Sequence, residues 1–282
     1  MNNKVQRTFI PGDEWLYYKI YCGVKMIDFI LTDLIKPITE ELLKQKLIDE
    51  WFFIRYSDPD SHLRVRFHIS KTENLARVIL GMNEKLSFYL ESNQVWDIQL
   101  LSYQRELERY GSNTIEDAES YFFYDSELVL NGIKNSNDDE SRFLNILKLV
   151  ENSLTLFNYD NERRLSFLNK MQLQFKSEFS VNKTVKKELS NKYRELQSQL
   201  FENDNYNDSP LTIYKHLQII VDRLLMLEKE NKLEISLENL LASFIHMTIN
   251  RGFRSKQRLY EMMIYDFLYK KNNSKFARNG ST

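Results

Sequence analysis

The stretch WFFIRYSDPDSHLRVRFHI, residues 51–69, decides the fold class. Residues 51–56 are aromatic or apolar, which is typical of a β-strand, and residues 62–69 alternate strictly between apolar and polar side chains. Residues 57–61, SDPDS, lie between them and form a dense turn signal. The stretch therefore predicts two strands joined by a short turn.

Strand and helix patterns alternate on both sides of this stretch. Residues 15–22, WLYYKIYC, predict a strand between two glycines, and residues 25–36 place apolar side chains at helical spacing. A short helical turn follows Pro37, residues 71–91 are amphipathic, and residues 94–101 return to an extended pattern. The resulting order is β-α-β-β-α-β, which is that of a ferredoxin-like, split βαβ unit.

Strand patterns largely disappear after about residue 114. Helical periodicity then recurs in seven windows: residues 114–131, 138–156, 161–179, 184–201, 211–229, 236–251 and 255–271. The breaks between windows are polar, and no low-complexity linker separates two independent folds. We therefore expect one α+β domain over residues 1–282, with a sheet-containing part at residues 1–112 and a mainly helical part at residues 113–282.

Composition and charge exclude several classes of protein. Lys and Arg number 39 and Asp and Glu 40, a balance that argues against nucleic-acid binding driven by bulk charge. The one cysteine, Cys22, excludes an internal disulfide and any multi-cysteine metal site. The sequence has no secretory signal, no long apolar run, no glycine-rich phosphate loop and no HExxH or CxxC motif. We therefore expect a cytoplasmic protein without a membrane partner, a metal or an organic cofactor.

The second predicted strand gathers cations on one face. Leu63, Val65, Phe67 and Ile69 share one side, and His62, Arg64, Arg66 and His68 share the other. Such cations repel each other unless an anion or paired carboxylates lie against them. We expect Arg55, on the preceding strand, to join this face. An ordinary solvated face covered by arginine stems is the alternative that the sequence leaves open.

Residues 103–111, YQRELERYG, bring further charges together if they are helical. Glu106 and Arg109 are three residues apart, and Arg105 and Arg109 are four apart, so each pair would share a helix face. The alternative interpretation is a surface ladder of ion pairs, worth about 0.3–0.5 kcal/mol per pair.

Residues 236–251, SLENLLASFIHMTINR, predict a helix with one apolar stripe. His246 points away from the centre of that stripe, small residues flank it, and Asn250 follows one turn later. A lone histidine is more often structural than catalytic, but the small neighbours leave room for a ligand.

Taken together, RYSDPDSHLRVRFH, YQRELERYG and FIHMTINR resemble the C-terminal domain of class I lanthipeptide dehydratases and its stand-alone relatives in thiopeptide pathways. The resemblance covers nearly the whole chain. In that family a large domain esterifies Ser or Thr of a precursor peptide with glutamate from glutamyl-tRNA. The smaller domain then eliminates glutamate and leaves dehydroalanine or dehydrobutyrine. The large domain does not occur in these 282 residues, so the resemblance implies the small subunit of a split enzyme.

The resemblance also assigns roles to residues. The family's two strand arginines correspond to Arg64 and Arg66, its Glu/Arg pair to Glu106 and Arg109, and its essential histidine to His246. These assignments imply a lyase in which His246 is the base and the arginines hold the leaving glutamate and stabilise the enolate. Further substrate contacts are expected from Arg55, His62, Arg105 and Asn250.

The expected partners are the precursor peptide and a glutamylating, tRNA-dependent subunit, without direct binding of nucleic acid. The sequence leaves open whether the chain forms a homodimer. Related stand-alone proteins close the pyridine ring of thiopeptides by a formal 4+2 cycloaddition, so ring formation is one alternative. A non-catalytic peptide-binding scaffold is another, in which the basic residues between 251 and 278 would supply contacts.

Overall fold

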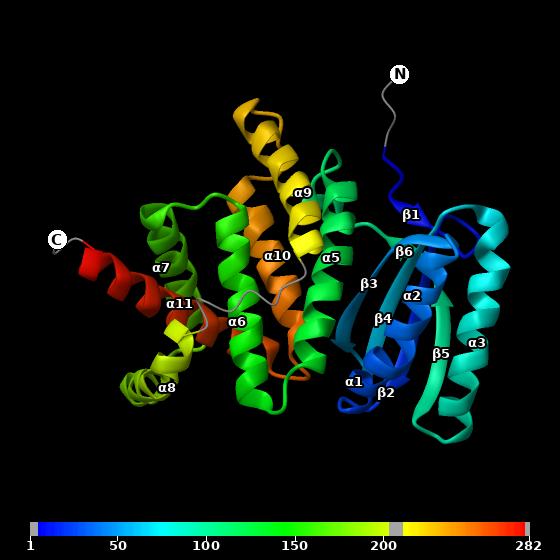
Figure 1. Ribbon diagram of the computed structural model, residues 1–282, viewed down its shortest axis with the longest axis horizontal. Helices are drawn as coiled ribbons and strands as arrows, with labels where there is room; N and C mark the ends of the chain where they lie inside the picture. Colours follow the sequence, from blue (N-terminus) through cyan, green and yellow to red (C-terminus); the bar gives the residue numbers. More distant parts are fainter. Residues whose placement is uncertain (1–4, 203–210, 280–282) are drawn as a thin grey trace.

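The first hundred residues form a four-stranded antiparallel sheet in a computed structural model that describes residues 5–202 and 211–279 (Figure 1). Its strands are β2 (Trp15–Cys22), β3 (Ile48–Ser57), β4 (Ser61–Ile69) and β5 (Val95–Leu101). They lie in the order β3-β4-β2-β5, so β3 and β5 are the edge strands. The predicted α+β class is therefore confirmed, and the strands follow the predicted order along the chain.

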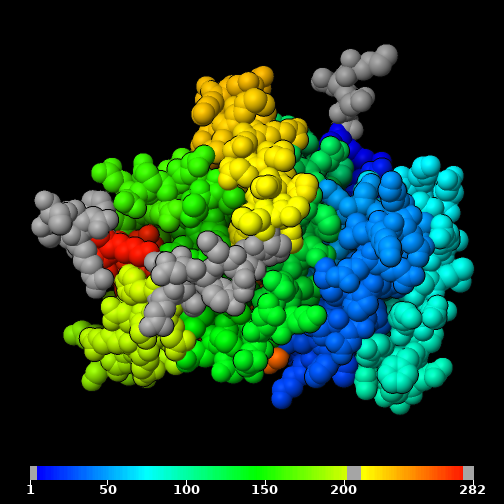
Figure 2. Space-filling view, in the orientation of Figure 1, coloured from blue at the N-terminus to red at the C-terminus, as the bar shows by residue number. Residues whose placement is uncertain are grey.

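Helices α1–α3 cover one face of this sheet. The first connection runs without a break through α1 (Met26–Phe29), the π-helical turn η1 (Ile30–Ile35) and α2 (Lys36–Lys44). Pro37, which has no N–H to donate to the preceding turn, lies where the π-helical turn passes into α2. The second connection consists of η2 (Thr72–Asn74) and α3 (Leu75–Glu91). Figure 2 shows α2 and α3 lying over the strands on the viewed side of the molecule.

A second, two-stranded sheet was not predicted. It pairs β1 (Thr8–Phe9) with β6 (Tyr103–Gln104), and the short helix α4 (Leu107–Tyr110) follows. The chain just after β5 is therefore extended at residues 103–104 and helical only from Leu107.

The remainder of the described chain is helical, in windows close to those predicted. The helices are α5 (Ile115–Lys134), α6 (Asp139–Leu156), α7 (Asn161–Glu178), α8 (Lys183–Glu202), α9 (Leu211–Lys229), α10 (Leu237–Gly252) and α11 (Gln257–Asn279). Side chains cap four of them: Asp138 and Ser141 form a capping box before α6, Asp160 caps α7, Asn182 caps α8 and Ser236 caps α10. None of the helices in the described ranges is both long and apolar enough to cross a bilayer.

The helical part joins the sheet along the edge strand β3, beside α5 and α10 (Figure 1). The Phe53 N–H donates to Ser126 Oγ of α5 at 3.4 Å, and Arg251 Nε of α10 donates to the Phe53 carbonyl at 2.8 Å. Asn250 accepts from the Arg55 N–H and donates to its carbonyl. Side chains thus satisfy backbone groups that an edge strand would otherwise leave open.

Candidate active site

Strand pairing gathers cations on the sheet face opposite helices α1–α3. Along β4, Arg66 lies between Tyr17 of β2 and Phe52 of β3, and Arg64 lies between Lys19 and Ile54. Directly opposed residues share a face, so Lys19, His62, Arg64 and Arg66 form one group, which we call the cationic cluster. The alternation seen in the sequence is therefore present in the sheet.

Arg66 is a buried member of the cationic cluster, with 6% of its surface exposed. Its guanidinium carbon lies 4.5 Å from the ring centre of Tyr17, 4.7 Å from that of Tyr103 and 5.2 Å from that of Phe52. Within the described chain, nothing accepts a hydrogen bond from its Nε or Nη1. Burial lowers its pKa, and the two tyrosines partly oppose that shift. A buried cation that has rings around it but no acceptor is suited to an anionic ligand.

Arg64, which is partly exposed, and His62, which is buried, lie beside Arg66 on the same face of β4. Arg64 Nε donates to His62 Nε2 at 3.0 Å, and the Arg64 guanidinium stacks 3.5 Å over the ring of Tyr56. Because His62 Nε2 accepts, Nδ1 carries the proton and donates to the Asp60 carbonyl at 2.8 Å. Burial, assisted by Arg64 and Lys19, lowers the pKa of His62. His62 is thus a neutral acceptor that orients Arg64.

Glu106 and Arg109 belong to the start and the last turn of the short helix α4. Glu106 is its N-cap residue, and its Oε2 lies 3.7 Å from Arg109 Nη1. The negative charge of Glu106 also acts on Arg66, where it partly opposes the lowering of the pKa by burial. Arg109 Nε donates to Ser243 Oγ of α10 at 3.2 Å. The pair therefore connects the surroundings of the cationic cluster to helix α10.

His246 lies on α10 one turn after Ser243. Residues three apart on a helix are neighbours, at about 5–6 Å between Cβ atoms. His246 therefore shares a face of α10 with Ser243, the residue to which Arg109 donates. The imidazole is about one-quarter exposed, and its Nδ1 lies 2.9 Å from Glu261 Oε2 of α11. An ionised carboxylate only accepts hydrogen bonds, so Nδ1 is the donor and Nε2 of the neutral ring has a free lone pair.

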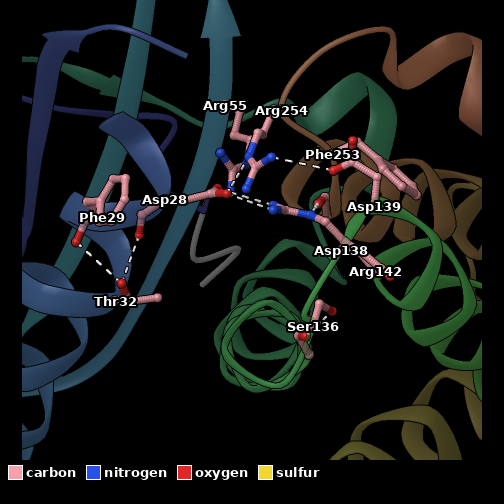
Figure 3. A network of polar contacts seen from close by, with 12 residues as sticks. Asp28, Phe29, Thr32, Arg55, Ser136, Asp138, Asp139, Arg142, Phe253 and Arg254 are labelled. Carbon is pink, nitrogen blue, oxygen red and sulfur yellow. Dashed lines mark hydrogen bonds and ion pairs between the residues drawn. The ribbon is translucent and has the colours of Figure 1, made fainter. Parts of the chain in front are cut away.

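Arg55 does not belong to this face, and the prediction that it joins Arg64 and Arg66 is wrong. It pairs with Leu63 in the sheet, so its side chain points to the face covered by α1–α3. There Nη2 donates to Asp28 Oδ1 at 2.6 Å and Nε donates to the Arg251 carbonyl at 2.7 Å. Arg142 and Arg254 bind the same carboxylate (Figure 3). Burial lowers the pKa of Arg55 to about 10, against the opposing charge of Asp28.

Arg105 is also engaged elsewhere. The expected helix does not include it, because α4 begins only at Leu107, so Arg105 and Arg109 do not share a helix face. Its Nε and Nη2 bind the two carboxylate oxygens of Glu119 at 2.8 and 2.6 Å. This bidentate ion pair occupies the guanidinium group that was expected to bind substrate.

Asn250 is also engaged in a contact that holds the fold together. Both ends of its amide bind the backbone of Arg55, at 3.1 and 3.2 Å. The structure therefore gives Asn250 the role of closing the β3 edge, and it brings neither Arg55, Arg105 nor Asn250 to the cationic cluster.

Several residues around the site were not singled out from the sequence. The alternation of β2 puts Tyr17 and Lys19 on the face of Arg66, and this signal was available in residues 15–22. Tyr103 and Glu261 lie on other elements than Arg66 and His246, and no spacing within the sequence connects them to either residue. Helical spacing does place Ser243 beside His246, but its contact with Arg109 could not be read from the sequence. No three His, Cys, Asp or Glu side chains of residues 5–202 and 211–279 are arranged to hold a metal ion.

Comparison with known proteins identifies the family. A model of the lantibiotic biosynthesis dehydratase C-terminal domain matches residues 15–271. The subtilin biosynthesis protein SpaB of Bacillus subtilis is 32% identical over 128 residues, and the nisin biosynthesis protein NisB of Lactococcus lactis subsp. lactis is 30% identical over 126 residues. Each alignment spans 44% of this chain and 12% of the relative, so the chain matches a small part of these longer proteins.

Solved structures share the fold. The tRNA-dependent lantibiotic dehydratase MibB from Microbispora sp. 107891 superposes with a TM-score of 0.71 at 20% identity, over 95% of this chain and 29% of MibB. The pyridine synthase TbtD from thiomuracin biosynthesis superposes with a TM-score of 0.63 at 11% identity, over 93% of this chain and 99% of TbtD. Because the family model covers most of the sequence, the chain belongs to the lantibiotic biosynthesis dehydratase C-terminal family.

Proposed function

We propose that the chain eliminates glutamate from glutamylated Ser or Thr residues of a ribosomally made precursor peptide, as the eliminating component of a dehydratase. The family supports a role in dehydration during peptide maturation. The chemistry of the cationic cluster and of His246 supports elimination as the specific step.

Arg66 is the observation that carries this proposal. Its guanidinium group is buried among three rings, and two of its nitrogens lack an acceptor in the described chain. An unpaired buried cation destabilises the fold by several kcal/mol, so a ligand carboxylate that accepts hydrogen bonds from these nitrogens offsets part of that cost and is bound more tightly for it. The departing glutamate supplies such a carboxylate, and Arg64 offers it a second cation close to solvent.

The elimination needs a base and a stabilised carbanion. His246 Nε2 takes the proton from Cα, the C–H electron pair becomes the Cα=Cβ bond, and the Cβ–O bond breaks as glutamate leaves as a carboxylate. Negative charge develops meanwhile on the amide oxygen next to Cα. Arg109, which Ser243 and Glu106 orient, is the cation that we assign to this oxygen. Glu106 has no proton-transfer role in this scheme.

The proposal implies a second protein. A protein that only eliminates must receive its ester from a glutamylating partner, so we expect transient association with such a protein and no direct binding of tRNA. A salt-dependent gel shift with glutamyl-tRNA would contradict this expectation.

The test uses the purified protein and a precursor peptide carrying glutamyl esters. We expect mass spectrometry to detect a dehydrated peptide together with free glutamate, and His246→Asn to lose activity by about 10²–10⁴-fold, the usual contribution of a general base. Full activity in His246→Asn would remove His246 from the mechanism. A second arm offers a fully dehydrated, azole-bearing peptide, and a cyclised product there would favour the ring-forming chemistry of TbtD-like proteins instead.

A further inference from the structure

The buried carboxylate of Glu261 has no assigned role in the chemistry described above. Glu261 lies on α11, and 2% of its side chain is exposed. Its Oε2 accepts from His246 Nδ1 at 2.9 Å, across two helices that pack side by side. A buried carboxylate requires partners of this kind, and this one uses the proposed catalytic base as a partner.

A second donor fixes the orientation of the same oxygen. Arg258, one turn earlier on α11, directs Nη1 to Glu261 Oε2 at 3.2 Å. Arg258 is itself held by Glu178 of α7 and stacks over Phe175. The printed contacts of the described chain thus bring three charged groups to this part of α10: Glu261 and Arg258 of α11, and Arg109 of α4, which binds Ser243. Of these, only Glu261 contacts the ring.

We propose that Glu261 is the positioning residue of His246: it binds the Nδ1 proton and so presents Nε2, without a proton, as the base. The inference rests on the proposed function for its consequence in catalysis, but the tautomer can be observed without activity. In the opposite tautomer Nε2 carries the proton and cannot accept another. If Glu261 is only an ion-pair partner of Arg258, its replacement changes stability and leaves the ring of His246 unaffected.

Two substitutions separate these interpretations. Glu261→Met removes the acceptor and retains the volume and the apolar stem, while Arg258 keeps its ion pair with Glu178. Glu261→Gln retains an acceptor, because Arg258 donates to that position and directs the amide oxygen, rather than the amide nitrogen, toward it. We therefore expect Glu261→Gln to preserve the Nδ1–H tautomer and most of the activity. Glu261→Met should lose both.

The measurement is long-range ¹H–¹⁵N NMR on the full chain labelled with ¹⁵N-histidine, at a pH where imidazole is neutral. The chain has four histidines, and the signals missing from His246→Gln identify His246. We expect the wild type to show a protonated Nδ1 and an unprotonated Nε2. Glu261→Met should show the Nε2–H pattern and an elimination rate lower by about 10²-fold.

Asp266→Asn is the matched control. Asp266 is another buried carboxylate on α11 and pairs with Lys176 and Lys270. Its replacement should reduce stability without changing the tautomer of His246. An unchanged tautomer in a folded Glu261→Met overturns the inference. If the tautomer changes but the wild type releases no glutamate, the positioning by Glu261 stands and the proposed function fails.

Discussion

Arg66 and Arg105 are both nearly inaccessible arginines close to the small β1–β6 sheet, and their guanidinium groups have opposite surroundings. Arg105 binds both oxygens of Glu119, whereas Arg66 has three aromatic rings and no acceptor at two of its nitrogens. A buried charge that is left unpaired reduces stability, and such a cost is retained where function needs it. This contrast at the level of single residues leads to a paired experiment.

We predict that Arg66→Met lowers the rate of glutamate release by at least about 10²-fold. Its free energy of unfolding should change by no more than about 1 kcal/mol, because removing the unpaired charge offsets the lost ring contacts. Urea unfolding and a glutamate-release assay measure the two quantities.

Arg105→Met is the control for this experiment. It leaves Glu119 buried without its cation, so we predict a loss of about 3–5 kcal/mol in the free energy of unfolding. If Arg66→Met were as destabilising as Arg105→Met, Arg66 would be a structural cation with a partner inside the protein.

His62 gives a prediction on pH. Burial and the neighbouring cations lower the pKa of the folded-state imidazole, so the unfolded chain binds a proton more readily than the folded one. Stability that depends on neutral His62 is therefore complete above the unfolded pKa of about 6.5 and is lost as the pH falls below it.

The comparison is made between wild type and His62→Gln, which retains an acceptor for Arg64 but does not titrate. Wild type should lose more stability than the variant when urea unfolding is repeated at pH 7.5 and 5.5 (roughly one unit on either side of the unfolded histidine pKa). Parallel losses would mean that the pKa of His62 is the same in the folded and the unfolded chain, contrary to its burial beside two cations.

At the scale of elements, the β3–β4 hairpin explains both what the sequence predicts about the site and what it does not. Alternation along β4 correctly places His62, Arg64 and Arg66 together, because side chains of one strand need no partner to define their face. The position of Arg55 depends on the register between two strands, and a shift of one residue reverses every face. The turn signal in residues 57–61 predicts a hairpin but does not determine that register.

The contacts between helices could not be predicted from the sequence, because they too depend on how separate elements are placed relative to each other. The windows of α5–α11 followed from periodicity, yet periodicity does not say which helices touch. Arg109 meets Ser243 across 134 positions of sequence, and His246 meets Glu261 on the next helix. Residues 103–104 pair with β1 as an extended strand instead of continuing the expected helix. Arg105 and Arg109 therefore do not share a helix face.

A substitution of Asn250 tests how much the side-chain contacts along the β3 edge contribute to stability. Asn250→Ala removes two hydrogen bonds to the backbone of Arg55, and we predict a loss of about 1–3 kcal/mol in the free energy of unfolding with an unchanged KM for the glutamylated peptide. Asn191→Ala, on the exposed side of α8, should change stability by no more than about 0.5 kcal/mol. A raised KM with unchanged stability in Asn250→Ala would instead restore the predicted role of Asn250 in substrate binding.

At the scale of the whole molecule, one carboxylate joins the sheet-containing part to the helical part. Asp28 of α1 binds Arg55 of β3, Arg142 of α6 and Arg254, which follows α10 (Figure 3). Arg251, Arg254 and Arg258 are thus all ion-paired, to Asp125, Asp28 and Glu178 respectively. These contacts do not support the open basic patch that a non-catalytic scaffold would use, and the side chain of Arg278 lies outside those described.

We predict that Asp28→Asn reduces the free energy of unfolding by about 3–5 kcal/mol at neutral pH, because three arginines lose their shared partner. Asp33→Asn, an exposed carboxylate on the adjacent η1, should change it by no more than about 0.5 kcal/mol.

The effect of Asp28 should also depend on pH. Its hydrogen bonds and ion pairs with the arginines hold the pKa of Asp28 below its usual range, against the opposing effect of burial. The carboxylate therefore stabilises the fold above the unfolded pKa of about 4, and this contribution is lost as the pH falls from there toward the folded pKa. The difference between wild type and Asp28→Asn in urea unfolding should narrow below about pH 4. A difference that did not depend on pH would rule out the ion pairs as its source.

The most direct test of the central claim follows the fate of the peptide in a single turnover. A precursor peptide with glutamyl-serine, and a second one deuterated at Cα of that serine, are mixed with excess protein and quenched for mass spectrometry. We predict free glutamate, a dehydroalanine in the peptide and slower formation of both from the deuterated peptide, because His246 removes the Cα proton. Release of glutamate with the serine hydroxyl restored would identify hydrolysis instead, and would contradict an eliminating site built from Arg66 and His246.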